Sequence, residues 1–174
     1  MERDWLARFL AHVPAGGTVL DLGCGMGEPI ARHLIAQGHP VVGVDTSPTL
    51  IALCRDRFPD HDWRVADMRG LALGRRVQGI LAWDSVFHLS HADQRAMIPT
   101  LAAHAAPGAP LLLTSGPAHG EAIGEFEGEP LFHASLAPEE YRALLGAQGF
   151  AVLEHRAEDP DCGGHTVWLA RLRD

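Results

Sequence analysis

A glycine-rich turn after a short apolar segment is the part of this sequence whose spacing most clearly suggests chemistry. Val19-Leu20 leads into Asp21–Gly27, which reads Asp-Leu-Gly-Cys-Gly-Met-Gly, and Pro29 then stands where the first turn of a helix tolerates proline. Glycine has no Cβ atom, so it permits positive φ and lets a ligand approach the backbone closely. The pattern predicts that main-chain atoms between a strand and a helix hold a ligand.

The spacing of this turn argues against a diphosphate ligand. A dinucleotide-binding fingerprint places its third glycine one residue later, where this sequence has Glu28, and an acid near a helix N-terminus repels phosphate. Asp45 follows the next apolar segment, and a carboxylate there can accept two hydrogen bonds from a ribose diol. Alternatively, Asp45 caps the following helix together with Ser47. We expect a phosphate-free ligand with Asp45 at its ribose.

The elements that position these residues alternate from Gly17 onwards, which is typical of an α/β fold with a parallel sheet and helices on both faces. Strands are predicted over residues 18–20, 41–44, 63–66, 79–83, 110–114, 150–156 and 165–172. Helices are predicted over residues 5–13, 29–35, 49–58, 91–104, with a kink or interruption at Pro99, and 138–149. Segment 115–137 lacks periodicity, and we expect it to be an irregular loop that covers the substrate.

These segments resemble the class I S-adenosylmethionine-dependent methyltransferases, as a small stand-alone domain. Asp21–Gly27 resembles the first motif of that family, Val42–Asp45 the second, Ala66–Met68 the third, and Ala82–Asp84 with Phe87–Leu89 the fourth. The resemblance covers nearly the whole chain and implies S-adenosylmethionine as the cofactor. It also implies a Rossmann-like, seven-stranded, mostly parallel sheet whose last strand is antiparallel, within a single methyltransferase domain over residues 1–174.

The resemblance implies roles for individual residues. Asp21 would lie near the methionine amino group, Asp45 would hold the ribose, and Asp67 would accept from the adenine amino group. Met68 would lie against the adenine ring, and Asp84 would face the methionine end or the substrate. The implied cofactor-binding residues are Asp21, Gly23, Cys24, Gly25, Gly27, Asp45, Thr46, Asp67, Met68 and Asp84.

One departure concerns the cover of the cofactor. Members of the family usually carry a longer N-terminal segment that folds over the site, whereas only the predicted helix 5–13 precedes the first strand here. We expect either that segment 115–137 covers the site alone or that the chain is short and the pocket unusually open.

Histidines are the candidate catalytic residues. Methyl transfer from a sulfonium is an in-line displacement, so the enzyme mainly aligns the reacting atoms, and a base is needed only when the nucleophile must lose a proton. His88 and His119 each follow a predicted strand end, and we assign them as catalytic candidates. His88 could equally pack under the next helix, and His133 and Tyr141 are further candidates.

Composition narrows the class of partner. The 174 residues carry a net charge of −8, which disfavours binding a phosphate backbone. No apolar run approaches the roughly 20 residues that would span a bilayer, so no membrane partner is expected. Three cysteines without paired spacing indicate reduced thiols in the cytoplasm. The oligomeric state stays open.

The leading function is therefore methyl transfer to a heteroatom of a small molecule. A nucleic-acid amine methyltransferase would show Asn/Asp-Pro-Pro-aromatic after the fourth strand, whereas this chain reads Asp84-Ser85-Val86-Phe87. Two alternatives are a non-catalytic S-adenosylmethionine-binding module and an NAD-dependent oxidoreductase, against which Glu28 argues.

Two further groups of polar residues could bind a metal ion or a charged ligand. No metal site is expected, because neither His119 with Glu121 nor Cys162 with His165 has a recognised ligand spacing. An acidic run could attract an amine or could simply form a solvated face of the loop. Its members are Glu121, Glu125, Glu127 and Glu129.

Overall fold

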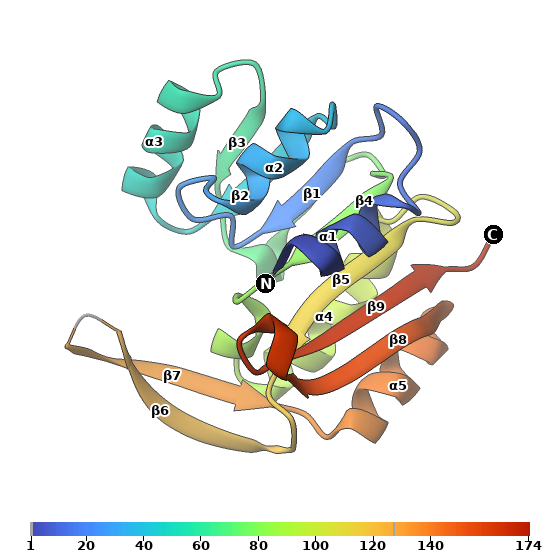
Figure 1. The fold of residues 1–174 in the computed structure, drawn as a ribbon. Coiled ribbons are helices and arrows are strands. Elements are labelled where there is room, and N and C mark those ends of the chain that lie inside the picture. The colour runs from blue at the N-terminus through green and yellow to red at the C-terminus, as the bar shows by residue number, and fades with distance from the viewer. Residues whose placement is uncertain (1, 127) are drawn as a thin grey trace.

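The chain alternates strands and helices around one large sheet, as the computed structural model of residues 2–126 and 128–174 shows (Figure 1). Its strands are β1 (Val19–Leu22), β2 (Val41–Asp45), β3 (Asp62–Val65), β4 (Gly79–Ala82), β5 (Pro110–Ser115), β6 (Gly120–Phe126), β7 (Glu129–Ser135), β8 (Phe150–Asp159) and β9 (His165–Leu172). Its helices are α1 (Glu2–Leu10), α2 (Ile30–Ala36), α3 (Pro48–Arg57), α4 (His91–His104) and α5 (Pro138–Ala147). Its 3₁₀ turns are η1 (Met68–Gly70), η2 (Val86–His88) and η3 (Pro160–Cys162).

Seven strands form the main sheet in the order β3-β2-β1-β4-β5-β9-β8. Strands β1 to β5 pair in parallel, whereas β9 runs antiparallel to both β5 and β8. The predicted seven-stranded, mostly parallel sheet with an antiparallel last strand is confirmed. Strands β2 and β3 lie on one side of β1, and β4 and β5 lie on the other. Such a reversal of strand order opens a crevice at the carboxyl ends of the strands, which is where the glycine turn lies.

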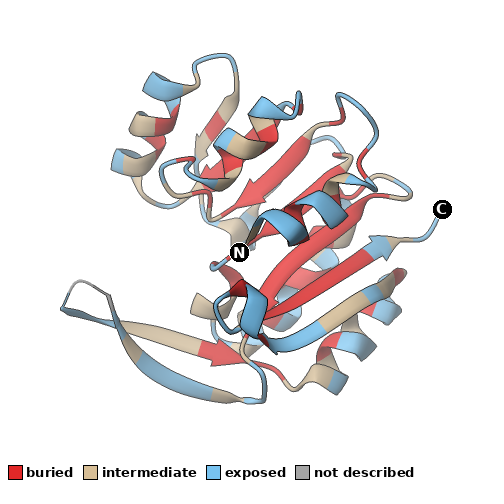
Figure 2. Ribbon diagram, viewed as in Figure 1, coloured by how far each residue is buried: buried red, intermediate tan, exposed pale blue. Residues whose placement is uncertain are grey.

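Helices bury the sheet on both faces. One face packs against α1, α2 and α3 through a cluster that includes Phe9, Leu34 and Ile51. The other face packs against α4 and α5 through a cluster that includes Leu101 and Tyr141. Strands covered on both faces need apolar residues at nearly every position, which explains the apolar runs in the sequence. Figure 2 shows the central strands β1, β4 and β5 buried along their length.

Segment 115–137 is not the irregular loop that the sequence suggested. Most of it forms an antiparallel hairpin in which β6 pairs only with β7, from Gly120 opposite Ser135 to Phe126 opposite Glu129. The hairpin projects from the body of the molecule (Figure 1), and most of its length is exposed or half-buried (Figure 2). Since neither face packs against the core over most of that length, the sequence carries no alternation of apolar and polar residues.

Helix α4 runs from His91 to His104, which is the predicted range, and it continues through Pro99. Of the kink or interruption predicted at Pro99, the interruption is therefore absent. Ile98 and Leu101 are buried against the sheet, and this packing offsets the hydrogen bond that proline cannot donate. None of the helices in the described parts of the chain has the length and apolar character needed to cross a membrane.

Gly43 in β2 provides a test of the packing beneath the glycine turn. A Cβ atom there would come within 2.2 Å of two carbons of the Trp63 ring and within 2.9 Å of Cys24 Sγ. We predict that Gly43→Ala lowers the free energy of unfolding by about 1–3 kcal/mol, because the buried ring must move. Urea unfolding followed by circular dichroism measures this change.

The matched control is Gly146→Ala in α5, where an added Cβ atom would meet nothing within 4 Å. This substitution should raise the free energy of unfolding by about 0.5–1 kcal/mol, because alanine favours a helix over glycine. Equal stability of the two variants would contradict the tight packing at Gly43.

Candidate functional site

The glycine turn is held in place by main-chain hydrogen bonds to the neighbouring strand. The amides of Gly23 and Cys24 both donate to the carbonyl of Val44, at 2.8 and 3.1 Å. Gly23, Gly25 and Gly27 have φ values of +74°, +55° and +77°, a region that side chains disfavour. The turn therefore needs glycine for its backbone conformation, as the sequence pattern predicted.

The turn also leaves room for a ligand. A Cβ atom on Gly25 would meet nothing within 4 Å, whereas one on Gly23 would lie 2.4 Å from Cβ of Ser85. The Ser85 hydroxyl beside Gly23 is buried and has no hydrogen-bond partner in the described part of the chain. Ser85 therefore packs directly against Gly23, and the side of the turn that is open to a ligand lies at Gly25.

Asp21 is a buried carboxylate directly before the turn. Its residue is 4% exposed, and within residues 2–126 and 128–174 no side chain forms an ion pair with it. Burial first, and then the charge of Asp45, raises the pKa of Asp21 to about 7. A nearby positive charge would stabilise the ionised form of this carboxylate, and no described side chain supplies one. The position therefore favours a cationic ligand.

Asp45 joins the turn to the end of β2. Its Oδ2 accepts from the Gly25 amide at 3.0 Å, and its Oδ1 accepts from the Ser47 amide at 2.9 Å. The side chain that caps α3 is Ser47, whose hydroxyl accepts from the Leu50 amide at 3.3 Å. Each carboxylate oxygen of Asp45 retains a lone pair, so the proposed ribose contact is compatible with this geometry. Thr46, the next residue, is exposed.

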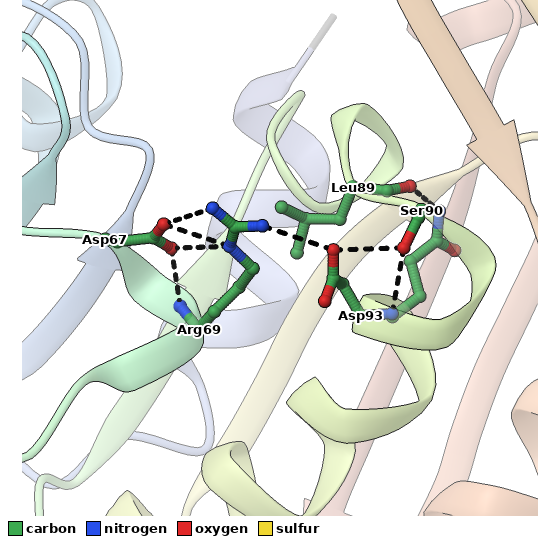
Figure 3. A network of polar contacts seen from close by, with 6 residues as sticks. Asp67, Arg69, Leu89, Ser90 and Asp93 are labelled. Atoms are coloured by element: carbon green, nitrogen blue, oxygen red, sulfur yellow. Dashed lines mark hydrogen bonds and ion pairs between the residues drawn. The ribbon is translucent and has the colours of Figure 1, made fainter.

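Asp67 is already paired within the protein (Figure 3). Its two oxygens accept from Nε and Nη2 of Arg69, and Oδ1 also accepts from the Arg69 amide at 2.9 Å. Arg69 extends to Asp93 at 3.3 Å, and Asp93 accepts from Ser90 at 3.0 Å. The guanidinium lowers the pKa of Asp67. An adenine amino group would compete with Arg69 for this carboxylate, while Met68 lies half-buried next to it.

Glu28 is not the uncompensated acid that the sequence suggested. It forms an ion pair with Arg32 at 2.5 Å and lies 3.7 Å from Arg57, so its charge is partly compensated. The argument that Glu28 repels a diphosphate is weaker than the sequence suggested.

Asp84, after β4, contacts a residue that the sequence analysis did not select. Its φ is +47°, and its carboxylate lies 3.1 Å from Nε2 of His165. His165 Nδ1 lies 2.6 Å from the Cys162 carbonyl. Both neighbours are acceptors, an arrangement that favours the doubly protonated, positively charged ring of His165. Burial opposes that charge, but the Cys162 carbonyl and Asp84 together raise the pKa of His165.

A cavity of about 930 Å³ opens beside Asp84, between the β6–β7 hairpin and the turn from β8 to β9. The glycine turn does not line this cavity, so the site has two halves, which we name the glycine-turn half and the acceptor cavity. The residues that line the acceptor cavity are Leu50, Asp84, Phe87, His88, Ser115, Gly116, Pro117, Ala118, Gly120, Glu121, Ala122, Leu131, His133, Ala134, Ser135, Glu158, Gly163, Gly164, His165 and Thr166.

Two histidines lie together on one wall of the acceptor cavity. Nδ1 of His88 donates to the Phe132 carbonyl at 3.1 Å, so in the neutral ring the lone pair is on Nε2. The rings of His88 and His133 are 5.0 Å apart. Burial and His88 lower the pKa of His133, although Asp84 opposes this effect.

The structure does not bring the other candidate residues into the acceptor cavity. His119 stacks on His91 with ring centroids 4.4 Å apart, outside the cavity lining. The Tyr141 hydroxyl donates to Gln94 at 2.5 Å within the core. Of the acidic run, Glu121 lines the cavity, and Glu127 lies outside the described residues.

Comparison with curated proteins identifies methyltransferases that differ in the acceptor named for each. The dTDP-3-amino-3,6-dideoxy-alpha-D-glucopyranose N,N-dimethyltransferase of Streptomyces fradiae is 34% identical over 106 residues, covering 60% of this chain and 41% of that protein. The trans-aconitate 2-methyltransferase of Azoarcus sp. (strain BH72) is 36% identical over 118 residues, covering 64% and 45%. The chain thus spans less than half the length of these relatives.

A solved structure and a family model complete the comparison. The Burkholderia thailandensis 1,6-didemethyltoxoflavin-N1-methyltransferase, with bound 1,6-didemethyltoxoflavin and S-adenosylhomocysteine, has a TM-score of 0.78 at 22% identity, covering 99% of this chain and 78% of that one. This similarity shows a shared fold. The family model for the methyltransferase domain matches residues 19–108, more than half of the chain and including the glycine turn. The chain therefore belongs to the methyltransferase domain family.

Proposed function

We propose that this chain transfers a methyl group from S-adenosylmethionine to a heteroatom of a small-molecule acceptor. The observation that carries the proposal is the buried Asp21 carboxylate, which has no ion-pair partner among the described residues, behind a turn that is open at Gly25. A positively charged nucleoside without phosphate matches both features. The family match and the methyltransferase names of the relatives support the same reaction.

In this proposal the glycine-turn half of the site holds the cofactor. Asp21 attracts the amino group of its methionine portion. Asp45 accepts from the ribose with the lone pairs that Gly25 and Ser47 leave free. Asp67 and Met68 receive the adenine once Arg69 yields part of its contact.

The acceptor cavity supplies the other half of the reaction. S-adenosylmethionine, when bound, supplies an activated methyl group on positively charged sulfur. His88 keeps the lone pair of Nε2 free, so it can take a proton from an acceptor that must lose one. The cavity orients the acceptor against the carboxyl ends of the strands.

The proposal covers the whole chain as one methyltransferase domain, in which the β6–β7 hairpin forms one wall over the acceptor. His119 remains a catalytic candidate only because it lies at the start of that hairpin, where its ring stacks on His91. We place the reaction in the cytoplasm, where the free cysteines Cys24, Cys54 and Cys162 stay reduced.

Binding of S-adenosylhomocysteine tests the cofactor directly. We predict that isothermal titration detects binding to the unmodified chain and that Asp45→Ala weakens it at least about tenfold, because a charged acceptor of the ribose is lost. Asp62→Ala is the matched control, since Asp62 begins β3 and pairs with Val42, at the other end of β2 from Asp45. Absence of binding to a folded, unmodified chain would overturn the proposal.

The charge of Asp21 should lower the free energy of unfolding and strengthen binding of the cofactor. Its pKa in the folded protein lies above the ordinary value of 3.8, so the stability it contributes is full below about pH 4 and is lost as pH rises to about 7. We predict that Asp21→Asn raises the free energy of unfolding at pH 8 by on the order of 2 kcal/mol, and by less as pH falls. Urea unfolding across this pH range measures the gain.

The same variant should bind S-adenosylhomocysteine at least about tenfold more weakly at pH 8, because the amide carries no charge for the cofactor's amino group. A variant that is less stable than the unmodified chain at pH 8, or that binds equally well, would contradict the role of Asp21.

Arg69 should compete with the cofactor for Asp67. We predict that Arg69→Ala tightens binding of S-adenosylhomocysteine by about threefold, since the exposed ion pair no longer has to be broken. The control is Arg75→Ala, whose side chain lies 3.7 Å from Asp62 instead. Weaker binding by the Arg69 variant alone would mean that Arg69 itself contacts the cofactor.

A further inference from the structure

The acceptor cavity carries an excess of negative charge. Asp84, Glu121 and Glu158 line it, and no arginine does in the described parts of the chain. The sequence contains no lysine that could supply a cation instead. Three carboxylates thus face one histidine of the lining, His165, whose pKa is raised.

This charge discriminates between the acceptor types that the relatives' names suggest. A polycarboxylate needs arginine or lysine side chains to neutralise it, and the acceptor cavity offers none of these among the described residues. An ammonium group is attracted by the same lining. Family membership does not choose between the two, because one named relative acts on an amino sugar and another on trans-aconitate.

The histidines of the acceptor cavity can make an amine reactive. An amine is protonated near neutral pH, so its nitrogen must lose a proton before its lone pair can attack. His88 donates from Nδ1 to the Phe132 carbonyl, which leaves Nε2 as the proton acceptor. His133 beside it favours the neutral form, because burial and His88 lower its pKa.

The body of the acceptor faces apolar groups. Leu50, Phe87, Leu131, Pro117 and Ala122 contribute to the lining, so most of the cavity wall away from the charged groups is hydrocarbon. An acceptor with an apolar body gains from burial there.

We propose, on the basis of the proposed methyl transfer, that the acceptor is an amine with a largely apolar body whose nitrogen binds between Asp84 and His88. The ammonium gives one proton to Nε2 of His88. The nitrogen lone pair then forms the bond to the methyl carbon as the carbon–sulfur bond of the donor breaks, with that electron pair left on sulfur. The products are the methylated ammonium and S-adenosylhomocysteine, and His88 releases its proton to solvent.

A matched pair of probes tests this inference. Chain saturated with S-adenosylhomocysteine is titrated with 2-phenylethylamine or with 3-phenylpropanoate, which share the phenyl body and differ in charge, and binding is followed by saturation-transfer NMR. We expect the amine to bind at least about fivefold more tightly than the carboxylate. Asp84→Asn should remove most of that preference, and Glu121→Gln, on the exposed hairpin, should reduce it without disturbing the core.

The control is Glu125→Gln, a second carboxylate on β6 that does not line the acceptor cavity and should leave the preference unchanged. Carboxylate binding equal to or tighter than amine binding would overturn the inference. Absence of amine binding to protein that binds S-adenosylhomocysteine would also overturn it, while leaving the proposed methyl transfer intact. Failure to bind S-adenosylhomocysteine would instead remove the proposed function itself.

Discussion

The Asp21 carboxylate is buried near the carboxyl end of β1, beside Asp45, and none of the described residues supplies a cation to balance it. Holding a carboxylate in such a place costs folding free energy, because burial disfavours its charged form. The packed strands on either side, and the main-chain hydrogen bonds from the turn to Val44, offset this cost. The arrangement becomes favourable when a cationic ligand enters, so the same interaction links fold stability to binding.

The other strand-end acids are used in different ways. Asp45 supports the turn and retains lone pairs for a ligand, whereas Asp67 is occupied by Arg69 in this structure. Asp84 lies at the border of the acceptor cavity, where His165 pairs with it. The sheet therefore brings all four carboxylates to the carboxyl ends of its parallel strands, and in the proposed function their different partners separate a cofactor side from an acceptor side.

Much of this arrangement could be predicted from the sequence. Strands buried on both faces appear in the sequence as apolar runs, and a turn that needs positive φ appears as glycines. The sheet and the turn at Gly23 could therefore be predicted. The β6–β7 hairpin was missed because its faces are largely exposed and show no alternation. Asp84 and His165 are 81 positions apart, so nothing local indicated their contact. The contact between Asp67 and Arg69 could have been predicted locally, because the two residues are only two positions apart and Asp67 directly precedes a short turn.

A crystal structure of the chain with S-adenosylhomocysteine tests the central claim most directly. The account predicts the ribose hydroxyls within hydrogen-bond distance of Asp45, the amino group facing Asp21, and the ligand lying against the open side of Gly25. A ribose held by other residues, or a turn closed by the protein's own side chains with the ligand elsewhere, would contradict it.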